Sequence, residues 1–307
     1  MDVLRSALIT LSHNHSLRRF CEHSRVGVRI SSRFVAGLTL ENALRTAEAV
    51  NGQGMAVTLD SLGESVTSEG EAHRAAEVYH RLLDAIAARK LDANISVKLT
   101  QMGLEQSEEM AESIAGSLTR HAHATGNFVR IDMEESRLTQ VTLDVVRRLH
   151  ACADLRGSIG VVIQAYLYRS QADVEQLLAD GIRVRLCKGA YREPAEVAFP
   201  RKAQVDRNFI LLSTMLLDSP LQHALATHDE AIIGAAKEFA RQHGVAADRF
   251  EFQMLYGVRR DLQRQLVREG YRVRVYVPFG SEWYPYFMRR LAERPANVLF
   301  LARNFLR

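Results

Sequence analysis

The sequence predicts an α/β protein built as a (β/α)8 barrel of the TIM type. Eight short β-rich runs recur along the 307 residues, and segments with apolar residues at helical spacing lie between them. Strands that alternate with helices form a parallel sheet, and eight of them in one domain-sized chain favour closure into a barrel. The chain has neither a break in composition nor a low-complexity linker that would mark a second large domain.

The eight β-rich runs appear in a regular order. They are GMAVTLD (54–60), ISVKLT (95–100), FVRIDME (128–134), GVVIQAYL (160–167), RVRLCKG (183–189), HALATHD (223–229), FEFQMLYG (250–257) and RVRVYVPFG (272–280). Segments such as EAHRAAEVYHRLLDAIAARK and SQADVEQLLADG are typical of the helices between them. A doubly wound open sheet is the alternative. It would more often have fewer strands, and the GQGMAV segment before the first run lacks the third glycine of a dinucleotide-binding loop.

The chain is expected to consist of two parts. Residues 1–35 are basic and partly amphipathic, which indicates one or two flanking helices, and residues 36–307 would form the catalytic barrel. The net charge of +4 and the pI of about 9.0 are only mildly basic, and without a Lys/Arg tract we expect no nucleic-acid partner. Three scattered cysteines suit a reducing compartment. Since we see neither a signal peptide nor a membrane-spanning run, we expect a cytoplasmic protein, with peripheral contact to the membrane left open.

Polar side chains occur where a parallel barrel should be apolar. Strands buried on both faces are normally continuous apolar runs, and a buried charge is costly unless it is paired or serves a ligand. Active sites of such barrels lie at the carboxyl ends of the strands. One polar residue at a strand end is more often structural, but five consecutive runs, from the second to the sixth, share the feature. The residues concerned are Lys98, Asp132, Gln164, Arg185 with Lys188, and Thr227 with His228.

The signs of these charges favour an anionic ligand. Lys98, Arg185 and Lys188 outnumber Asp132, and the adjacent Arg289 and Arg290 would make the mouth strongly cationic if they lie over it. Arginine binds carboxylate or phosphate through its planar fork. The alternative for the arginine pair is a solvated helix face paired with Glu293. The KGA turn that begins at Lys188 has a glycine where backbone could approach a phosphate.

Several common catalytic motifs do not occur in the sequence. There is no GxSxG elbow, no HExxH motif, no carboxylate cluster of the two-metal type and no recognisable cysteine nucleophile. We therefore expect no metal. A fixed positive pocket with little acid–base equipment indicates that a cofactor performs the difficult step.

Eight strings of residues, in order and at similar intervals, resemble the proline dehydrogenase family in its short monofunctional bacterial form. They are SVKLTQMG, FVRIDMEES, VVIQAYLYRS, VRLCKGAYREP, ATHDE, FQMLYGVR, VYVPFGSEWYPY and MRRLAERPAN, and the resemblance runs from about Phe34 to the C-terminus. It implies a distorted barrel whose last helix lies over the mouth, and non-covalent FAD as cofactor. It also implies oxidation of L-proline to Δ1-pyrroline-5-carboxylate, with hydride transfer to flavin N5 and electrons passed to a membrane quinone.

The resemblance further implies roles for individual residues. Asp132 and Arg185 would be catalytic, Asp132 by holding the network through Lys98 and Arg185 by a hydrogen bond near flavin N5. The substrate-binding residues would be Lys98, Arg289 and Arg290 at the carboxylate, Tyr276 over the proline ring, and Leu255 and Tyr286 on its apolar side. Glu293 would pair with one of the two arginines. The FAD contacts would come from Met133, Gln164, Arg185, Lys188, Gly189, Ala190, Thr227 and His228. Arg192 stands where some longer relatives have tryptophan, which puts stacking on the adenine in question.

Three other interpretations stay open at this point. A barrel enzyme without flavin could use the cationic pocket for a phosphorylated substrate, and the absorption of a bound flavin would separate the two cases. A non-enzymatic module could bind membrane or nucleic acid through the basic N-terminus. A relative that oxidises hydroxyproline would differ only in the pocket wall. The oligomeric state and the preferred quinone are not indicated by the sequence.

Overall fold

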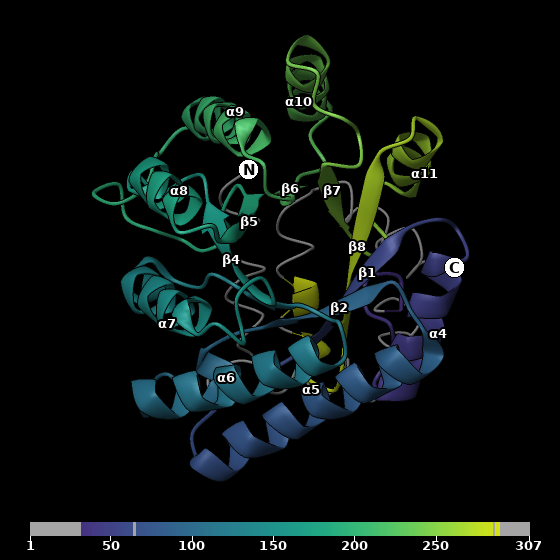
Figure 1. Cartoon of the computed structure of the whole chain (residues 1–307), viewed down its shortest axis with the longest axis vertical. Helices are drawn as coiled ribbons and strands as arrows, with labels where there is room; N and C mark the ends of the chain where they lie inside the picture. Colours follow the sequence, from purple (N-terminus) through teal and green to yellow (C-terminus); the bar gives the residue numbers. More distant parts are fainter. Residues whose placement is uncertain (1–31, 64–65, 285, 289–307) are drawn as a thin grey trace, which may run out of the picture.

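The computed structural model describes residues 32–63, 66–284 and 286–288. Its eight strands are parallel and close into one barrel in chain order, with helices around the outside (Figure 1). The closed barrel confirms the predicted fold class, and the open-sheet alternative is wrong. The strands are β1 (Ala56–Ser61), β2 (Ala93–Val97), β3 (Val129–Ile131), β4 (Ile159–Gln164), β5 (Arg183–Cys187), β6 (His223–Ala226), β7 (Phe250–Leu255) and β8 (Arg272–Phe279).

Closure joins the first strand to the last. Val57 of β1 pairs with Ala93 of β2 on one side and with Val275 of β8 on the other. The carboxyl ends of all eight strands therefore lie at one end of the barrel, where side chains from distant parts of the sequence can meet.

The connections between strands are mainly α-helical. The helices are α4 (Leu40–Asn51), α5 (Glu69–Arg89), α6 (Glu108–Ala124), α7 (Thr139–Ala151), α8 (Ser170–Ala179), α9 (Lys202–Asp218), α10 (Glu230–Gln242) and α11 (Arg260–Arg268), with short 3₁₀ turns η1 (Thr100–Met102) and η2 (Ser136–Leu138). Ser68 and Ser107 begin α5 and α6 as N-caps, because each hydroxyl accepts a hydrogen bond from a backbone N–H of the first turn. Of the helices in the described residues, none is long and apolar enough to cross a membrane.

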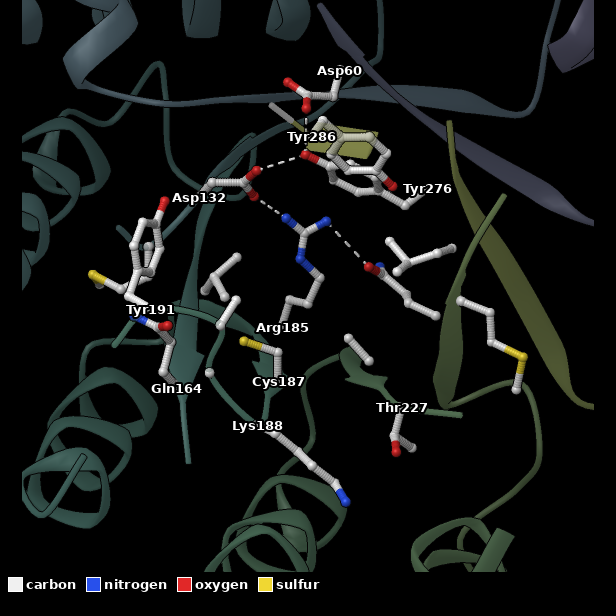
Figure 2. Close-up of a pocket in the computed structure, with 18 of the residues that line it drawn as sticks. Asp60, Asp132, Gln164, Arg185, Cys187, Lys188, Tyr191, Thr227, Tyr276 and Tyr286 are labelled. Carbon is white, nitrogen blue, oxygen red and sulfur yellow. Dashed lines mark hydrogen bonds and ion pairs between the residues drawn. The ribbon is translucent and has the colours of Figure 1, made fainter. Parts of the chain in front are cut away.

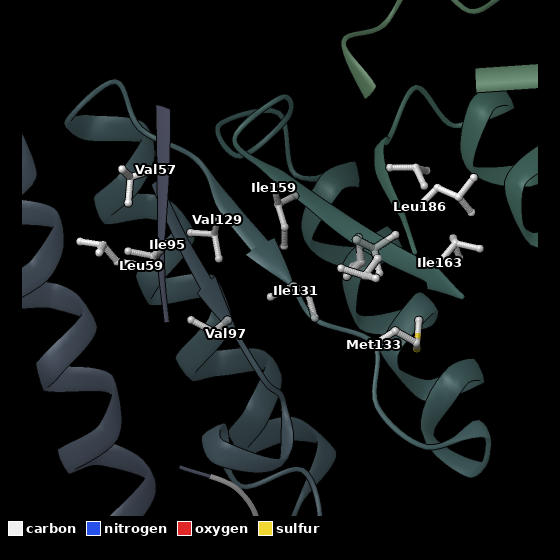
Figure 3. Close-up of a cluster of buried hydrophobic side chains, with 14 of the residues drawn as sticks. Val57, Leu59, Ile95, Val97, Val129, Ile131, Met133, Ile159, Ile163 and Leu186 are labelled. Carbon is white, nitrogen blue, oxygen red and sulfur yellow. The ribbon is translucent and has the colours of Figure 1, made fainter. Parts of the chain in front are cut away.

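The hydrophobic core lies between the barrel and its helices. Val57, Leu59, Ile95 and Val97 are fully buried and belong to this layer (Figure 3). Strand residues alternate in direction, so Ser96, between Ile95 and Val97, faces the barrel interior. The outer faces are apolar, whereas the interior is filled largely by hydrogen-bonded polar side chains.

Seven of the eight predicted strand runs extend too far at their carboxyl ends, the exception being the first. Lys98 follows β2, Asp132 and Glu134 follow β3, and Lys188 follows β5. These polar side chains hydrogen-bond groups of other strands, helices and loops, and the regular strand pairing ends before them, although single backbone bonds such as that from Asp132 to the Val97 carbonyl continue past it. Glu134, for example, accepts hydrogen bonds from both the backbone N–H and the hydroxyl of Thr100, at 3.1 Å and 2.6 Å.

Two predictions fall largely on residues outside the described ranges. The N-terminal flanking helices were expected over residues 1–35, of which only 32–35 are described, so that division stays a prediction. The last helix over the barrel mouth would continue beyond residue 288. Near both ends of the described chain, Phe34 and Val35 pack in one buried cluster with Trp283 and Tyr284.

His223, at the start of β6, makes stability depend on pH. Burial, followed by the nearby Arg130 and Arg183, lowers the pKa of His223 from 6.5 to about 3. The neutral ring accepts a hydrogen bond from the backbone N–H of Val184 at 3.0 Å. Because the unfolded chain takes up this proton first, the stability contributed by neutral His223 is complete above about pH 6.5 and is lost as the pH falls towards 3.

We expect the His223→Asn variant to be less sensitive to acid than the parent chain. Between about pH 7 and about pH 5, its free energy of unfolding should fall by about 2 kcal/mol less, because it removes this one proton-binding site from the unfolded state. Urea unfolding at a series of pH values measures the difference. His73→Asn, which changes an exposed histidine on α5, is the control. Parallel pH curves for the parent and the His223 variant would contradict the assignment.

Candidate active site

A cavity of about 740 Å³ opens at the carboxyl ends of the barrel strands. Every sequence-predicted site residue that lies in the described ranges lines it (Figure 2). These residues are Lys98, Asp132, Met133, Gln164, Arg185, Lys188, Gly189, Ala190, Thr227, His228, Leu255, Tyr276 and Tyr286. Arg289, Arg290 and Glu293 lie outside the described residues, so their predicted roles are not tested by the structure.

Asp132 is the centre of a buried hydrogen-bond network. Its Oδ1 accepts from the Ser96 hydroxyl at 2.6 Å and from the Arg185 guanidinium, and its Oδ2 lies 2.8 Å from the Tyr276 hydroxyl. Burial alone would raise the pKa of Asp132, but the charges of Arg185 and Lys98 outweigh it and hold that pKa below its usual range. The carboxylate is therefore ionised at neutral pH and fixed in position.

Arg185 is held on two sides of the barrel interior. Its Nη2 donates to Ser96 Oγ at 2.9 Å and also to Asp132, while its Nη1 donates to Gln253 Oε1 of β7 at 3.3 Å. The guanidinium lies 5.2 Å from the centre of the Tyr276 ring. Figure 2 shows this head group in the middle of the site, pointing towards Asp132. A permanent positive charge is thus displayed in the cavity with little freedom to move.

A second carboxylate, Asp60, completes the network from β1. Lys98 Nζ lies 3.2 Å from Asp60 Oδ2 and 3.6 Å from Asp132 Oδ2. The Tyr276 hydroxyl lies 2.7 Å from Asp60 Oδ2, so it touches both carboxylates. Its one proton can serve only one of them at a time, and the Lys98 ammonium compensates the remaining negative charge. Burial first, and then Asp132 and Asp60, raise the pKa of Tyr276, so the phenol keeps its proton.

The predicted excess of positive charge is wrong for the described part of the cavity. Its lining includes the cations Lys98, Arg185, Lys188 and Lys202 and the anions Asp60, Asp132, Asp229 and Glu282. The prediction counted Asp132 alone among the carboxylates and left out Asp60, which ends the first run, and Asp229, which ends the sixth. An excess at the mouth would have to come from residues such as Arg289 and Arg290, outside the described ranges.

The loop after β5 forms the other side of the cavity. Lys188 Nζ pairs with Asp206 at 2.5 Å and with Asp229 at 2.9 Å. Gly189 has a φ of +110°, and a side chain there would collide with the ring of Tyr166. A residue other than glycine would therefore be strained in the KGA turn, and the approach of its backbone to a phosphate stays a prediction.

The remaining polar residues of this side are oriented by backbone groups. Gln164 donates from Nε2 to the Glu134 carbonyl at 2.7 Å. His228 accepts at Nε2 from the backbone N–H of Leu255 at 3.0 Å, which places the proton of a neutral ring on Nδ1. Both side chains are thus held before any ligand arrives.

Several lining residues were missed from the sequence. Asp60 had a signal, because it ends the first predicted run. Tyr191 could also have been found from the sequence, because it follows the KGA turn directly. It lines the cavity, whereas Arg192 is not among the lining residues. Gln253 had a weaker signal as a polar residue inside an apolar run. Ser96 does not line the cavity but holds Asp132 and Arg185 there, and no sequence pattern indicated it, because a buried serine in a strand is unremarkable until its partners are known.

Comparison with known proteins now identifies the family. The family model for proline dehydrogenase matches residues 43–303. The chain belongs to the proline dehydrogenase family. Proline dehydrogenase 1 of Bacillus subtilis subsp. natto is 42% identical to it, over 99% of this chain and 100% of that protein. Proline dehydrogenase of Deinococcus radiodurans is 39% identical, over 100% of this chain and 99% of its own length. These full-length matches confirm the resemblance to the short monofunctional form and place the chain among oxidoreductases.

Solved structures agree with this assignment to the proline dehydrogenase family. The crystal structure of proline utilization A from Bdellovibrio bacteriovorus, inactivated by N-propargylglycine, is similar with a TM-score of 0.82 and 28% sequence identity. The match covers 87% of this chain but only 33% of that larger protein. Proline utilization A from Bradyrhizobium japonicum matches with a TM-score of 0.76 over 88% of this chain and 31% of its own. The shared part is therefore the barrel.

Proposed function

We propose that this chain oxidises L-proline to Δ1-pyrroline-5-carboxylate with non-covalent FAD as cofactor and a membrane quinone as final electron acceptor. The observation that carries the proposal is the buried network of Asp60, Lys98, Asp132, Arg185 and Tyr276 at the carboxyl end of the barrel. It displays fixed cations, balanced by carboxylates, in a cavity that apolar side chains such as Met133, Leu255 and Tyr286 also line. Membership of the proline dehydrogenase family makes proline the first substrate to test.

The cavity suits a flavin nucleotide. Its volume of about 740 Å³ falls in the range of cofactor pockets. Gly189 has no side chain, so its peptide groups form part of the cavity wall, and the neighbouring Lys188 would supply a positive charge for a phosphate group of the cofactor. The residues that would hold FAD are Met133, Gln164, Arg185, Lys188, Gly189, Ala190, Thr227 and His228. When bound, FAD supplies a two-electron acceptor that takes hydride at N5.

The substrate would be held by charge at one end and by apolar contact at the other. Lys98, with Arg289 and Arg290, would bind the carboxylate, and this positions the ring. Tyr276 would cover the ring, with Leu255 and Tyr286 on its apolar side. The proline nitrogen must lose its ammonium proton before hydride leaves, and nearby cations lower the pKa of such an amine. Asp132 is a weak base because its pKa is held below the usual range and its oxygens already accept hydrogen bonds, so we assign proton removal to water.

Arg185 would act on charge that develops during the reaction. Its guanidinium is fixed by Asp132, Ser96 and Gln253, so no reorganisation is needed when negative charge appears beside it. In this proposal Asp132 and Arg185 are the catalytic pair. Asp132 positions both Arg185 and Lys98.

An anaerobic spectrum of the purified protein tests the proposal. We expect the visible flavin absorption to bleach on addition of L-proline and to return with a soluble quinone. A colourless protein that cannot be loaded with FAD would contradict the cofactor assignment. A coloured protein that bleaches with hydroxyproline but not with proline would reject the substrate.

The quinone and the cellular location are part of the same proposal. We expect a cytoplasmic protein that contacts the membrane surface to reach its acceptor. Proline-dependent reduction of quinone in lipid vesicles, with co-sedimentation of the protein, measures both. Reduction of soluble quinone without any vesicle binding would keep the acceptor and reject the membrane contact.

We expect the Gly189→Ala variant to lose FAD. A Cβ at this left-handed position would collide with Tyr166, so the loop must shift away from the cofactor wall. FAD retention during gel filtration should fall by about tenfold or more, which corresponds to about 1.4 kcal/mol of binding free energy.

Gly234→Ala on α10 is the matched control, because an added Cβ there meets nothing within 4 Å. It should retain FAD fully and gain slightly in stability, since alanine favours helix. Equal FAD content in the two variants would show that the KGA turn does not shape the cofactor site.

A further inference from the structure

A second cavity, of about 470 Å³, opens at the opposite end of the barrel. Its lining comes from the N-terminal ends of the strands and the loops that lead into them. Four arginines face it, namely Arg130, Arg183, Arg272 and Arg274, against two carboxylates, Asp92 and Glu251. The described lining therefore carries two more positive than negative charges, with His123 counted as neutral.

The two carboxylates are already occupied by two of the arginines. Arg274 Nε lies 2.9 Å and 3.0 Å from the oxygens of Glu251. Arg272 Nη2 lies 2.8 Å and 3.0 Å from the oxygens of Asp92. The Arg274–Glu251 pair is buried in the barrel, whereas the Arg272–Asp92 pair is largely exposed at its rim. The excess charge of the described lining therefore belongs to the other two arginines.

Arg130 carries a buried guanidinium that pairs with no carboxylate of the described residues. Its exposed fraction is 5%, and its Nη1 donates to the carbonyls of Val161 and Arg183, at 3.2 Å and 2.6 Å. Its Nε and Nη2 make no hydrogen bond with described residues. Gly160 leaves room for it, since a side chain there would overlap the guanidinium. Burial, and then the charges of Arg185 and Arg183, lower the pKa of Arg130, yet a guanidinium stays protonated at neutral pH.

Arg183 is in the same situation. Its Nη2 donates to the Gly157 carbonyl at 2.6 Å, and no carboxylate of the described chain pairs with it. Both guanidinium groups flank one ring, with the carbon centres of Arg183 and Arg130 at 3.8 Å and 4.7 Å from the centroid of Phe128. The ring offers each a weak cation–π contact but does not neutralise their charge.

A buried charge without a partner is costly, and a second positive charge beside it raises the cost. Arg130 is such a charge within the described residues, and the partly buried Arg183 lies beside it. We propose that this cavity is a binding site for a phosphate-type dianion, either inorganic phosphate or the terminal phosphate of a small phosphomonoester. A dianion matches the excess of two charges, and the planar forks of arginine suit its oxygens. Ser158 and His123, hydrogen-bonded to each other at 2.9 Å in the same lining, supply further polar groups. The site is separate from the candidate active site and does not depend on the proposed reaction.

Thermal unfolding of the FAD-loaded protein tests the proposal. We expect saturable stabilisation by inorganic phosphate, by roughly 5 °C, above that of sodium chloride at equal ionic strength. A parallel titration with glycerol phosphate identifies the source of the phosphate group. Stabilisation at a lower concentration of glycerol phosphate than of inorganic phosphate would indicate a phosphomonoester, and the reverse order would indicate inorganic phosphate. Identical effects of phosphate and chloride would overturn the site.

Variants locate the binding. Arg183→Gln and Arg130→Met should each weaken phosphate binding by about tenfold or more. Arg241→Gln, which removes one exposed positive charge on α10, should bind phosphate as the parent does. If Arg130→Met does not fold, Arg183→Gln decides alone, because that side chain is only partly buried.

The candidate active site must be excluded as the phosphate site. The titration is therefore repeated with saturating L-proline, and with the Lys98→Met variant, whose second cavity is intact. Phosphate binding that survives both changes and is lost in Arg183→Gln supports the proposal. Binding that is lost with proline or with Lys98→Met, and kept in Arg183→Gln, would place the anion at the other end of the barrel and overturn it.

Discussion

The Asp132→Asn variant is expected to lose proline oxidation by about 100-fold or more in kcat/KM. The amide keeps the shape of the side chain but removes the charge that pairs with Arg185 and lies 3.6 Å from Lys98. Arg185 then has no carboxylate partner among the described residues and can turn from its fixed position. Removing one member of a buried ion pair should also lower the free energy of unfolding by about 3 kcal/mol. Steady-state kinetics with a soluble quinone and urea unfolding measure the two effects.

Asp173→Asn separates catalysis from stability. Asp173 on α8 is also a buried aspartate paired with an arginine, since Arg169 Nε lies 2.8 Å from its Oδ2, but it lies outside the cavity. We expect a comparable loss of stability with nearly full activity. Activity of Asp132→Asn within about twofold of the parent, which is under about 0.5 kcal/mol, would remove Asp132 from the catalytic pair.

The Lys98→Met variant is expected to raise the KM for proline by about 100-fold while FAD content stays unchanged. Lys98 lies between Asp60 and Asp132. In the proposed function it binds the substrate carboxylate, so its loss would remove one charge there, worth about 2 to 3 kcal/mol. The loss also takes away a charge that lowers the pKa of Asp132. The acid limb of kcat/KM should therefore move to higher pH.

Lys237→Met is the matched control for this change. Lys237 is partly buried and pairs with Glu269, away from the cavity. It should keep both the KM and the pH profile of the parent. A Lys98 variant with a raised KM but an unmoved acid limb would mean that Lys98 contacts substrate without tuning Asp132. An unchanged KM would exclude it from the substrate site.

Much of the fold and part of the site could be predicted from local patterns. The eight runs and the helices between them follow from side-chain periodicities of two and of 3.6 residues, which depend only on neighbouring residues. Lys98, Asp132 and Arg185 stood out for the same reason, as polar residues at the ends of apolar runs. The limits of the strands were predicted less well, because the polar side chains that end a strand bind partners far away in the sequence.

Asp60 and Arg130 show what local pattern could not supply. Asp60 ends the first run as Asp132 follows the third, but its role depends on Tyr276, which lies 216 positions later and reaches it at 2.7 Å. Arg130 looks like Asp132 in sequence, two positions away in the same run. Only the barrel shows that Arg130 lines the cavity at the N-terminal end and Asp132 the one at the carboxyl end.

By itself, the sequence determined the class of fold, the family and the strands that carry charge. Only the tertiary structure decided which charges meet. It showed that acidic and basic side chains balance in the described part of the active-site cavity. It also showed that two arginines with no carboxylate partner among the described residues lie at the N-terminal end of the barrel. The reason is physical. Periodicity is a property of neighbouring residues, whereas the pairing of charges depends on barrel closure. Closure brings β1 beside β8 and points every second strand side chain into one shared interior.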